Sequence, residues 1–300
     1  MNTANTRFQE FLAREVKKYK GIYVPVKAGL MKRACCRKIS CKKLHPNPND
    51  EFCLPQIGPN YEIISRYEHD LRIIKNDPQK ARFIESSATE PLIIEKIRPD
   101  GYMILNGHHR WAAAVRIGVK RLPVRIVNLT LETDIKSMLQ NSRHNKRVTM
   151  DLDEVVFSTG PDDQTEKALP FPFNRVYRER LRLGIPALFR FFNANGYDIW
   201  VYSAKYYSVD YIKEFFKLYH VHVTGIVTGT ARKGPKDSIA REKLESQVNN
   251  KYPFTVHIDS GMVLWINSLT KDFKEYPLSS SAAGWSSEIM AIVGSVEKHE

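Results

Sequence analysis

Two carboxylates at the end of an apolar run are the residues of this 300-residue chain best placed to do chemistry. The run from Arg147 to Phe157 is rich in apolar and β-branched residues and contains Asp151 and Asp153. In an extended strand, side chains two positions apart lie on the same face, so both carboxylates can point into one site. They repel each other unless a cation or a shared proton lies between them. The spacing favours a chemical role over the alternative, a solvated turn after a strand, where Asp is common.

Three further polar residues are placed where they can join this pair. The second half of the chain alternates apolar strand-like runs with helix-like runs, which predicts βαβ units and a mostly parallel sheet. Ser203 and Asp259 each end an apolar run. Lys236 lies at the start of a helix-like run, and Lys233, near the same helix start, competes for the role of the lysine in the site. Ligands of such sheets bind at the carboxyl ends of the strands. The strand-end residues are therefore predicted to share one crevice with the two carboxylates.

Phosphoryl transfer is the chemistry that such a set of side chains suits. Asp151 would attack phosphorus as the nucleophile, and Asp153 would protonate the leaving oxygen. Ser203 and Lys236 would hold the oxygens of the transferring group. Magnesium prefers a few carboxylates together with phosphate oxygens and water, and its predicted ligands are Asp151, Asp153 and Asp259.

In this order and spacing, the second half resembles the haloacid dehalogenase (HAD) superfamily of phosphohydrolases. The matching motifs are Asp-Leu-Asp-Glu-Val-Val-Phe at 151–157, Val-Tyr-Ser at 201–203 and His-Ile-Asp-Ser-Gly at 257–261. The resemblance implies a Rossmann-like three-layer α/β domain over residues 146–300, with little or no cap. It also implies a Mg²⁺-dependent phosphatase with an aspartyl-phosphate intermediate, acting on a phosphorylated small molecule, a nucleotide or a nucleic-acid end. Ser260 stands where the family usually has a second acidic residue, which predicts a weaker metal site.

The first half contains a second motif, at a bend between a strand and a helix. Asn106 and Gly107 form the bend, and His108, His109 and Arg110 open an alanine-rich helix. The free backbone N–H groups of that helix start, with an arginine in the first turn, predict an anion site. The alternative for the two histidines is a structural one, in which they make capping contacts at the turn.

Residues 20–128 resemble the ParB/sulfiredoxin superfamily in the order of their segments: a Pro-Asn-Pro turn, a helix, a Glu-Pro-Leu-Ile-Ile strand, a hairpin, the Asn-Gly-His-His-Arg box and a closing strand. The resemblance implies an N-terminal α+β domain over residues 1–145, including a linker. It implies binding of a nucleoside triphosphate, ATP or CTP, through Asn106, Gly107, His108, His109 and Arg110. A kinase activity, as in amino-acid kinases of this fold, would use Glu51 or Asp50 as the base. His108 replaces the reactive cysteine of sulfiredoxins, which argues against sulfinic acid reduction, and no helix pair suited to a helix-turn-helix follows the box.

Charge is concentrated in the first half of the chain. Residues 1–145 carry 26 Lys and Arg against 14 Asp and Glu, whereas residues 146–300 carry 20 against 19. A basic half suits a nucleotide or nucleic acid, although it can also simply aid solubility. It supports a rival interpretation, a nucleic-acid-associated protein whose second half is a degenerate HAD scaffold.

Composition also bears on membranes, compartment and metals. No apolar run is long enough to span a bilayer, and the first ten residues lack a signal-peptide core, so we predict no membrane partner and a cytoplasmic location. The four cysteines, between residues 35 and 53, lack the C-x₂-C spacing that is typical of zinc sites.

Overall fold

The computed structural model describes residues 3–76, 87–158, 160, 164–232, 238–279 and 284–296. Within these ranges, no helix combines the length and the hydropathy needed to cross a membrane. The chain divides into two compact units: unit 1 is Met1–Asn128 with Arg232–Lys236, and unit 2 is Leu129–Ala231 with Asp237–Glu300. This division falls before residue 146, where the sequence placed the start of the second domain. The reason is helix α5 (Glu132–Asn141), which packs against β9 (Gly225–Thr228) and α9 (Ser238–Lys251) of unit 2.

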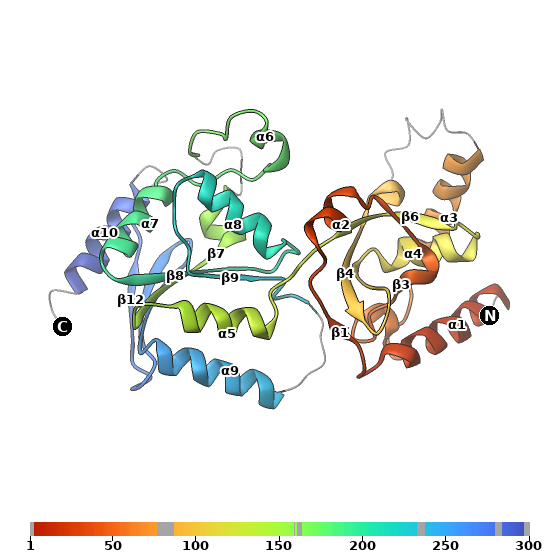
Figure 1. The fold of residues 1–300 in the computed structure, drawn as a ribbon, viewed down its shortest axis with the longest axis horizontal. Coiled ribbons are helices and arrows are strands. Elements are labelled where there is room, and N and C mark those ends of the chain that lie inside the picture. Colours follow the sequence, from red (N-terminus) through yellow and green to blue (C-terminus); the bar gives the residue numbers. More distant parts are fainter. Residues whose placement is uncertain are drawn as a thin grey trace. The chain divides into compact units, whose positions relative to one another are not determined.

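Unit 1 is a mixed sheet covered by helices (Figure 1). Its helices are α1 (Thr3–Tyr19), α2 (Leu30–Cys35), α3 (Tyr61–Asn76) and α4 (His108–Arg116), with 3₁₀ turns η1 (Cys41–Lys43), η2 (Glu51–Cys53) and η4 (Ser87–Thr89). Its strands are β1 (Val24–Pro25), β2 (Lys38–Ser40), β3 (Leu44–His45), β4 (Leu92–Arg98), β5 (Tyr102–Asn106) and β6 (Arg121–Ile126). The strand order is β2-β6-β4-β5-β3, with β1 paired to β4.

The sequence of unit 1 explains how the start of α4 is positioned. Strands β4 and β5 form an antiparallel hairpin around the Pro-Asp-Gly turn, and Gly107 then turns the chain directly into α4 with φ of 100°. Three consecutive alanines of α4, with Trp111, are completely or almost completely buried. Small side chains let α4 approach the sheet closely, so the bend at its start is held between helix and strand.

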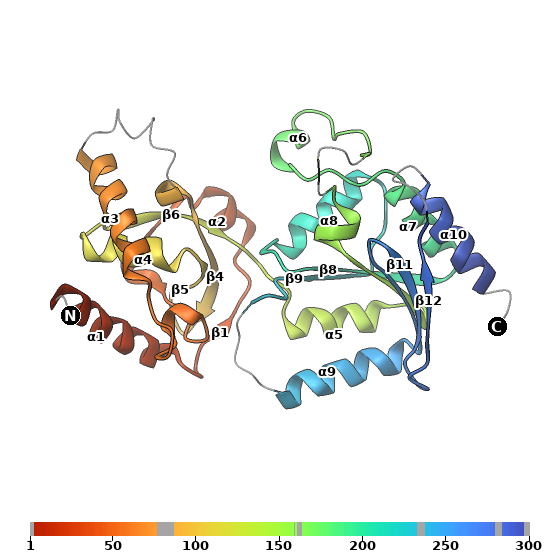
Figure 2. The same ribbon diagram turned by 180° about the vertical axis from the view of Figure 1, so that it is seen from behind.

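Unit 2 is a sheet with helices on both faces (Figure 2). Its strands are β7 (Lys146–Asp151), β8 (Tyr197–Ser203), β9, β10 (Phe254–Ile258), β11 (Met262–Asn267) and β12 (Phe273–Pro277). Besides α5 and α9, its helices are α6 (Phe173–Val176), α7 (Ile185–Ala194), α8 (Val209–Leu218) and α10 (Trp285–Val296). In Figures 1 and 2, α5 and α9 lie on one face of the sheet, and α7, α8 and α10 lie on the other.

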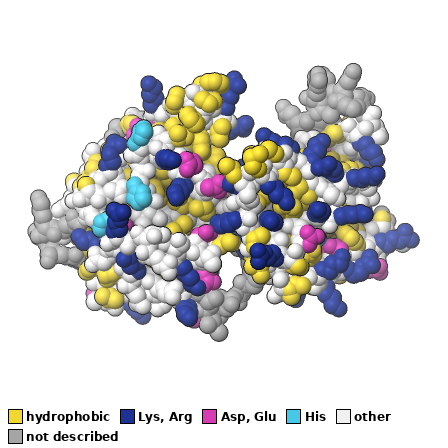
Figure 3. Space-filling model, viewed as in Figure 1, with side chains coloured by type: hydrophobic (Ala, Val, Ile, Leu, Met, Phe, Trp, Pro, Cys, Tyr) yellow, Lys and Arg dark blue, Asp and Glu magenta, His cyan; other side chains and the backbone are white. Residues whose placement is uncertain are grey.

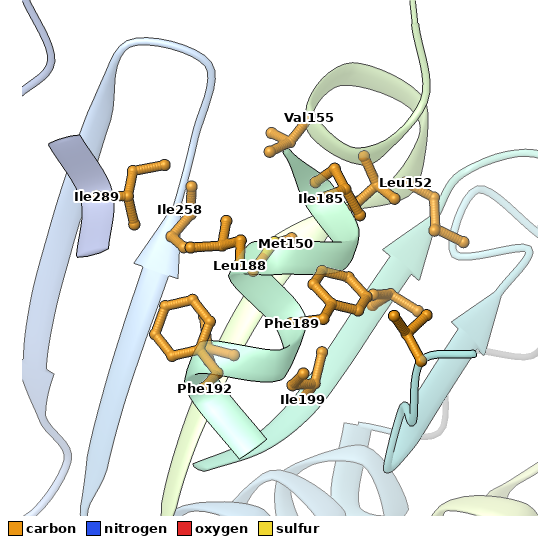
Figure 4. Close-up of a cluster of buried hydrophobic side chains, with 14 of the residues drawn as sticks. Met150, Leu152, Val155, Ile185, Leu188, Phe189, Phe192, Ile199, Ile258 and Ile289 are labelled. Carbon is orange, nitrogen blue, oxygen red and sulfur yellow. The ribbon is translucent and has the colours of Figure 1, made fainter. Parts of the chain in front are cut away.

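The core of unit 2 lies between its sheet and α7 (Figure 4). Leu188, Phe189 and Phe192 of α7 are completely buried and lie against Met150 of β7 and Ile199 of β8. Apolar side chains recur at helical spacing on one face of α7, and others lie on the side of the strands that faces this helix. Burial of these two apolar faces against each other forms the core layer. This layer fixes the positions at which β7 and β8 end.

The sheet of unit 2 is mixed, whereas the sequence predicted a mostly parallel one. Strands β10, β7, β8 and β9 are parallel neighbours in that order, while β11 and β12 extend the sheet as antiparallel strands. The signal for β11 was present: a continuous apolar run, Met262 to Ile266, follows a Ser-Gly turn at 260–261. The four parallel strands still place their carboxyl ends at one edge.

Candidate functional site

The carboxyl ends of the parallel strands bring predicted polar residues of unit 2 to one edge of the sheet. Asp151 is the last residue of β7, and Ser203 is the last residue of the neighbouring strand β8. Asp259 directly follows Ile258, which pairs with Met150 of β7. The register therefore puts the three residues at adjacent strand ends, the edge at which open α/β sheets bind ligands.

The turn after β7 is a short π-helix, η5 (Leu152–Val156), and the Asp151 side chain caps its N-terminal end. Oδ1 of Asp151 accepts hydrogen bonds from the backbone N–H groups of Asp153 at 2.6 Å and of Glu154 at 3.0 Å. A side-chain oxygen in this position satisfies N–H groups that have no partner within the turn. Leu152 and Val155 are completely buried beneath it. Asp151 thus uses one carboxylate oxygen to hold the turn that carries Asp153.

The Asp153 carboxylate contacts two groups at the end of β8. Ser203 Oγ donates a hydrogen bond to Oδ2 at 2.7 Å, and Lys205 Nζ lies 3.4 Å from Oδ1. Oδ1 is buried and accepts no hydrogen bond from the described part of the chain, so the nearby Lys205 ammonium supplies the compensating charge. The sequence missed Lys205, although it lies two positions after Ser203 in the loop that follows the strand. The predicted Lys236 and its competitor Lys233 lie outside the described residues.

The three carboxylates predicted to bind magnesium do not come together as one group. In the described part of the chain, no set of three or more His, Cys, Asp and Glu side chains is placed to hold a metal ion. Asp153 is engaged at the end of β8, and Asp259 Oδ1 accepts the N–H of Ser260 at 2.6 Å in the turn before β11. Asp151 and Asp259 lie at adjacent strand ends, and Mg²⁺ needs only one or two carboxylates besides phosphate oxygens and water, so magnesium binding by this pair stays a prediction.

A cavity of about 470 Å³ surrounds the start of α4 in unit 1. Its lining residues are Asp50, Ile63, Tyr67, Ser87, Glu90, Leu105, Asn106, Gly107, His108, His109 and Arg110. All five residues of the predicted nucleotide site are among them, as is the candidate base Asp50, whereas the other candidate base, Glu51, is exposed and does not line the cavity. A Cβ atom at Gly107 would lie 2.4 Å from Leu92 Cδ2, so this wall of the cavity requires glycine.

The two histidines of the cavity hold the loop that faces α4. Nε2 of His108 accepts the backbone N–H of Asn47 at 3.2 Å, and Nε2 of His109 accepts that of Asn60 at 3.2 Å. The Phe52 ring stacks on His108, with centroids 5.4 Å apart, and meets His109 edge-on at 5.0 Å. Because Nε2 accepts in both rings, each neutral imidazole carries its proton on Nδ1. Both histidines therefore have structural contacts, but these join α4 to a neighbouring loop and are not capping contacts at the Asn106–Gly107 turn.

The charge of the cavity does not come from His109. Burial lowers the pKa of His109, and the nearby charge of Asp50 offsets this effect only in part, so its imidazole is neutral at pH 7. Asp50 Oδ1 lies 3.8 Å from Nδ1 of His108 and accepts the N–H of Phe52 at 3.0 Å. The positive groups left for an anion are the helix start and Arg110.

Arg110 is held by groups of unit 1 itself. Its Nη1 donates to Glu90 Oε2 at 2.6 Å and to the Ser87 carbonyl at 3.0 Å, and its Nη2 donates to Asn106 Oδ1 at 3.1 Å. Its Nε is buried and has no hydrogen-bond partner among the residues that the structure describes. The Arg110 side chain is 7% exposed and that of Glu90 is 64% exposed. A phosphate at α4 would compete with Glu90, a residue that the sequence did not single out.

Comparison with known proteins gives a partial match in the first half. The model of the ParB N-terminal domain matches residues 81–143, the stretch that contains β4, β5, α4, β6 and α5. A crystal structure of C-terminally truncated chromosome-partitioning protein ParB from Caulobacter crescentus, complexed to the centromeric parS site, aligns with 22% identity and a TM-score of 0.22. That alignment covers 35% of this chain and 46% of the ParB chain. The search of curated proteins found no match.

The family match supports one of the two resemblances that the sequence indicated. This chain is similar to the ParB N-terminal domain over residues 81–143, which overlaps the predicted 20–128 at 81–128 and extends through α5 of unit 2. The matched residues end before β7 begins at Lys146. The HAD resemblance of unit 2 therefore stays a prediction.

Proposed function

We propose that unit 2 catalyses phosphoryl transfer from a phosphomonoester, in the manner of the HAD phosphohydrolases that its sequence resembles. The observation that carries this proposal is the placement of Asp153 between the Ser203 hydroxyl and the Lys205 ammonium. Asp153 lies in the π-turn whose start the Asp151 side chain caps. The parallel order β10-β7-β8-β9 supports it, because these strand ends form the usual ligand edge of such sheets.

The proposed reaction uses the side chains in two steps. When a phosphomonoester binds, the Ser203 hydroxyl and the Lys205 ammonium turn from Asp153 to the phosphate oxygens, and Asp153 then holds a proton. The Asp151 oxygen that does not cap η5 attacks phosphorus, the bond from phosphorus to the leaving oxygen breaks, and Asp153 donates its proton to that oxygen. Water then attacks the aspartyl-phosphate, Asp153 takes up the proton of this water, and Asp151 is released with inorganic phosphate. The Ser203 hydroxyl and the Lys205 ammonium hold the phosphate oxygens where negative charge develops.

Magnesium is part of this proposal as a prediction. Asp151 and Asp259 would bind it, and the ion would neutralise charge on the phosphate oxygens. Removal of divalent cations with EDTA is expected to abolish phosphate release, and added Mg²⁺ is expected to restore it.

Phosphate release from p-nitrophenyl phosphate tests the catalytic claim. Asp151→Asn and Asp153→Asn are each expected to lower kcat/KM by at least about 100-fold, since each removes a group that reacts. Asp272→Asn, a change of the same kind at an exposed turn in unit 2, serves as the matched control. Equal rates for the wild type and Asp151→Asn would contradict the proposal.

A second candidate function has its own support. In it, the basic first half binds nucleic acid, and unit 2 is a scaffold without activity. The similarity to the ParB N-terminal domain over residues 81–143 favours it, as does the excess of Lys and Arg in residues 1–145. The comparisons support this candidate better than they support catalysis, because the family match ends before β7, which carries Asp151. The paired carboxylates favour the enzyme, since a scaffold has no need of Asp153.

Salt dependence separates the two candidates. A nucleic-acid-binding protein loses affinity steeply as salt rises, because each neutralised phosphate releases counterions. Binding of duplex and single-stranded DNA is therefore measured between about 50 and 200 mM salt, together with phosphatase activity. DNA binding with a steep salt slope and no phosphate release would favour the scaffold; phosphate release that depends on Asp151 would favour the enzyme.

We also propose that the cavity at α4 binds the phosphates of ATP or CTP. The Gly107 bend exposes the N–H groups of the helix start, and Arg110 supplies charge in the first turn. A kinase activity would use Asp50, which lines the cavity, in preference to Glu51, which does not.

A further inference from the structure

We propose that residues 167–180 of unit 2, here called the aromatic–arginine segment, form a stacking surface for single-stranded nucleic acid. Bases would stack on Phe171 and Phe173, and backbone phosphates would contact the neighbouring cations. The strand would deliver a terminal phosphate to Asp151, a part of the inference that rests on the function proposed above for unit 2.

The first observation is a pair of aromatic rings exposed to solvent. Phe171 is 69% exposed and Phe173 is 41% exposed. The guanidinium of Arg175 lies over the Phe171 ring, 5.1 Å from its centroid. Figure 3 shows hydrophobic side chains gathered over α6 with Lys and Arg at their margins. Aromatic faces bordered by guanidinium groups are the combination that holds single strands, because every base has a face that stacks on a ring.

The second observation is the charge of the segment. Lys167, Arg175 and Arg178 are exposed, while the one carboxylate of the segment, Glu179, is half-buried and accepts a hydrogen bond from the Tyr211 hydroxyl. The exposed charges are therefore all positive. Such a surface complements the phosphate backbone of a nucleic acid and repels a cationic ligand.

The third observation is the anchoring of the segment to the candidate site. The Ser158 N–H, which follows η5, donates to the Arg180 carbonyl at 2.8 Å. The Tyr211 hydroxyl donates to the Val176 carbonyl at 3.2 Å, and Tyr211 stacks on Tyr207, in the loop that also carries Lys205. The segment is thus attached to both chain stretches that hold Asp153. A strand bound on it lies at the carboxyl edge of the sheet.

These observations favour a single strand over a duplex. Bases that are paired and stacked in a helix cannot present their faces to protein rings, whereas unpaired bases can. Stacking on rings is tolerant of sequence, so the surface is expected to bind single strands without a strong base preference.

Photo-crosslinking tests the location without relying on catalysis. The intact chain carrying Asp151→Asn is irradiated with a 12-nucleotide single strand that contains 5-iododeoxyuridine, and the crosslinked peptides are mapped. Crosslinks to Phe171 or Phe173 are expected. Their absence from residues 167–180 would overturn the inference, even if unit 1 binds the same strand.

Affinity and kinetics test the stacking itself. Phe171→Ala with Phe173→Ala is expected to lose these crosslinks and to raise KM for a phosphorylated single strand by about 10-fold or more, since stacking on each ring contributes several-fold to affinity. Hydrolysis of p-nitrophenyl phosphate by this variant should stay at the wild-type rate. Phe171→Trp should keep the crosslinks, because it preserves a ring, and Phe273→Ala, at an equally exposed phenylalanine of β12, serves as the control.

The outcomes distinguish this inference from the function on which it rests. Crosslinks at the two rings without any phosphatase activity would support the stacking surface and contradict the catalytic proposal. Phosphatase activity with equal KM for the double variant and the wild type would support the catalytic proposal and contradict the stacking surface. Equal loss of binding to inorganic polyphosphate in the double variant would also overturn the inference, because polyphosphate has charge but no bases.

Discussion

Arg110 shows how a single residue of a candidate site is controlled by a partner distant in sequence. Its guanidinium is almost fully buried, yet one of its bonds is to the exposed carboxylate of Glu90. An ion pair with an exposed carboxylate contributes little free energy, so a stronger anion can displace the carboxylate. The pair therefore sets how readily the helix start of α4 accepts a phosphate.

Glu90→Gln is expected to tighten the binding of ATP or CTP by about fivefold, because it removes a charge that competes for Arg110. Isothermal titration calorimetry on the intact chain measures the Kd. Glu62→Gln, at an exposed position of α3, removes the same charge elsewhere and should leave the Kd unchanged. Weaker or equal binding by Glu90→Gln would show that Arg110 does not contact the phosphates.

At the scale of elements, both candidate sites depend on how strands end. In unit 1, a left-handed glycine joins β5 directly to α4; in unit 2, the Asp151 side chain closes a π-turn after β7. Further from the sites, the buried Asp198 of β8 accepts hydrogen bonds from Ser142 at 2.7 Å and from Tyr252 at 3.0 Å. These bonds join β8 to the ends of α5 and α9.

Gly107→Ala is expected to destabilise unit 1 by about 2–4 kcal/mol, because it adds backbone strain at positive φ and a clash with Leu92. Chemical denaturation measures the loss. Gly118→Ala is the matched control: its φ is also positive, at 74°, but no atom lies within 4 Å of the added Cβ, so a loss of only about 1 kcal/mol is expected. Similar losses for the two variants would mean that the close approach to Leu92 is unimportant.

Asp198→Asn is expected to destabilise unit 2 by about 2 kcal/mol at pH 7. Burial raises the pKa of Asp198, but hydrogen bonds from Ser142, His144 and Tyr252 outweigh it and hold this pKa below its usual value. A depressed carboxyl pKa stabilises the fold above the unfolded pKa of about 3.9, and this contribution is lost as the pH falls through the folded pKa. The difference in Tm between the wild type and the variant should therefore be full at pH 6–7 and shrink below about pH 4. A difference that grows on acidification would contradict this assignment.

At the scale of the whole molecule, the two largest hydrophobic cores of the described residues have no residue in common. One core belongs to unit 2 and is centred on α7 and the parallel strands; the other belongs to unit 1 and includes Trp111 and the alanines of α4. Each unit has its own candidate site for phosphate. Stability is therefore expected to divide as the cores do.

Calorimetry of the intact chain is expected to resolve two unfolding transitions. Gly107→Ala should lower only the transition of unit 1, and Asp198→Asn only that of unit 2, because each change acts within one core. Fluorescence of Trp111, followed in a variant whose other three tryptophans are replaced by Phe, assigns the transition of unit 1. A single transition that both variants shift equally would show that the two cores unfold together.

The sequence by itself determined where the polar residues fall along the chain. Apolar alternation and helical spacing are local patterns, so they located the strands that end at Asp151, Ser203 and Asp259, and the bend at Gly107. The turn at Ser260 and Gly261, between β10 and β11, is also a local signal.

Only the tertiary structure decided the partners of these residues. Lys205 meets Asp153, Glu90 meets Arg110, and the histidines accept N–H groups of the loop that faces α4, whereas the three predicted magnesium ligands do not form one group. Each of these contacts joins segments that are far apart in sequence. Their geometry depends on strand register and on packing between layers, which no local pattern encodes.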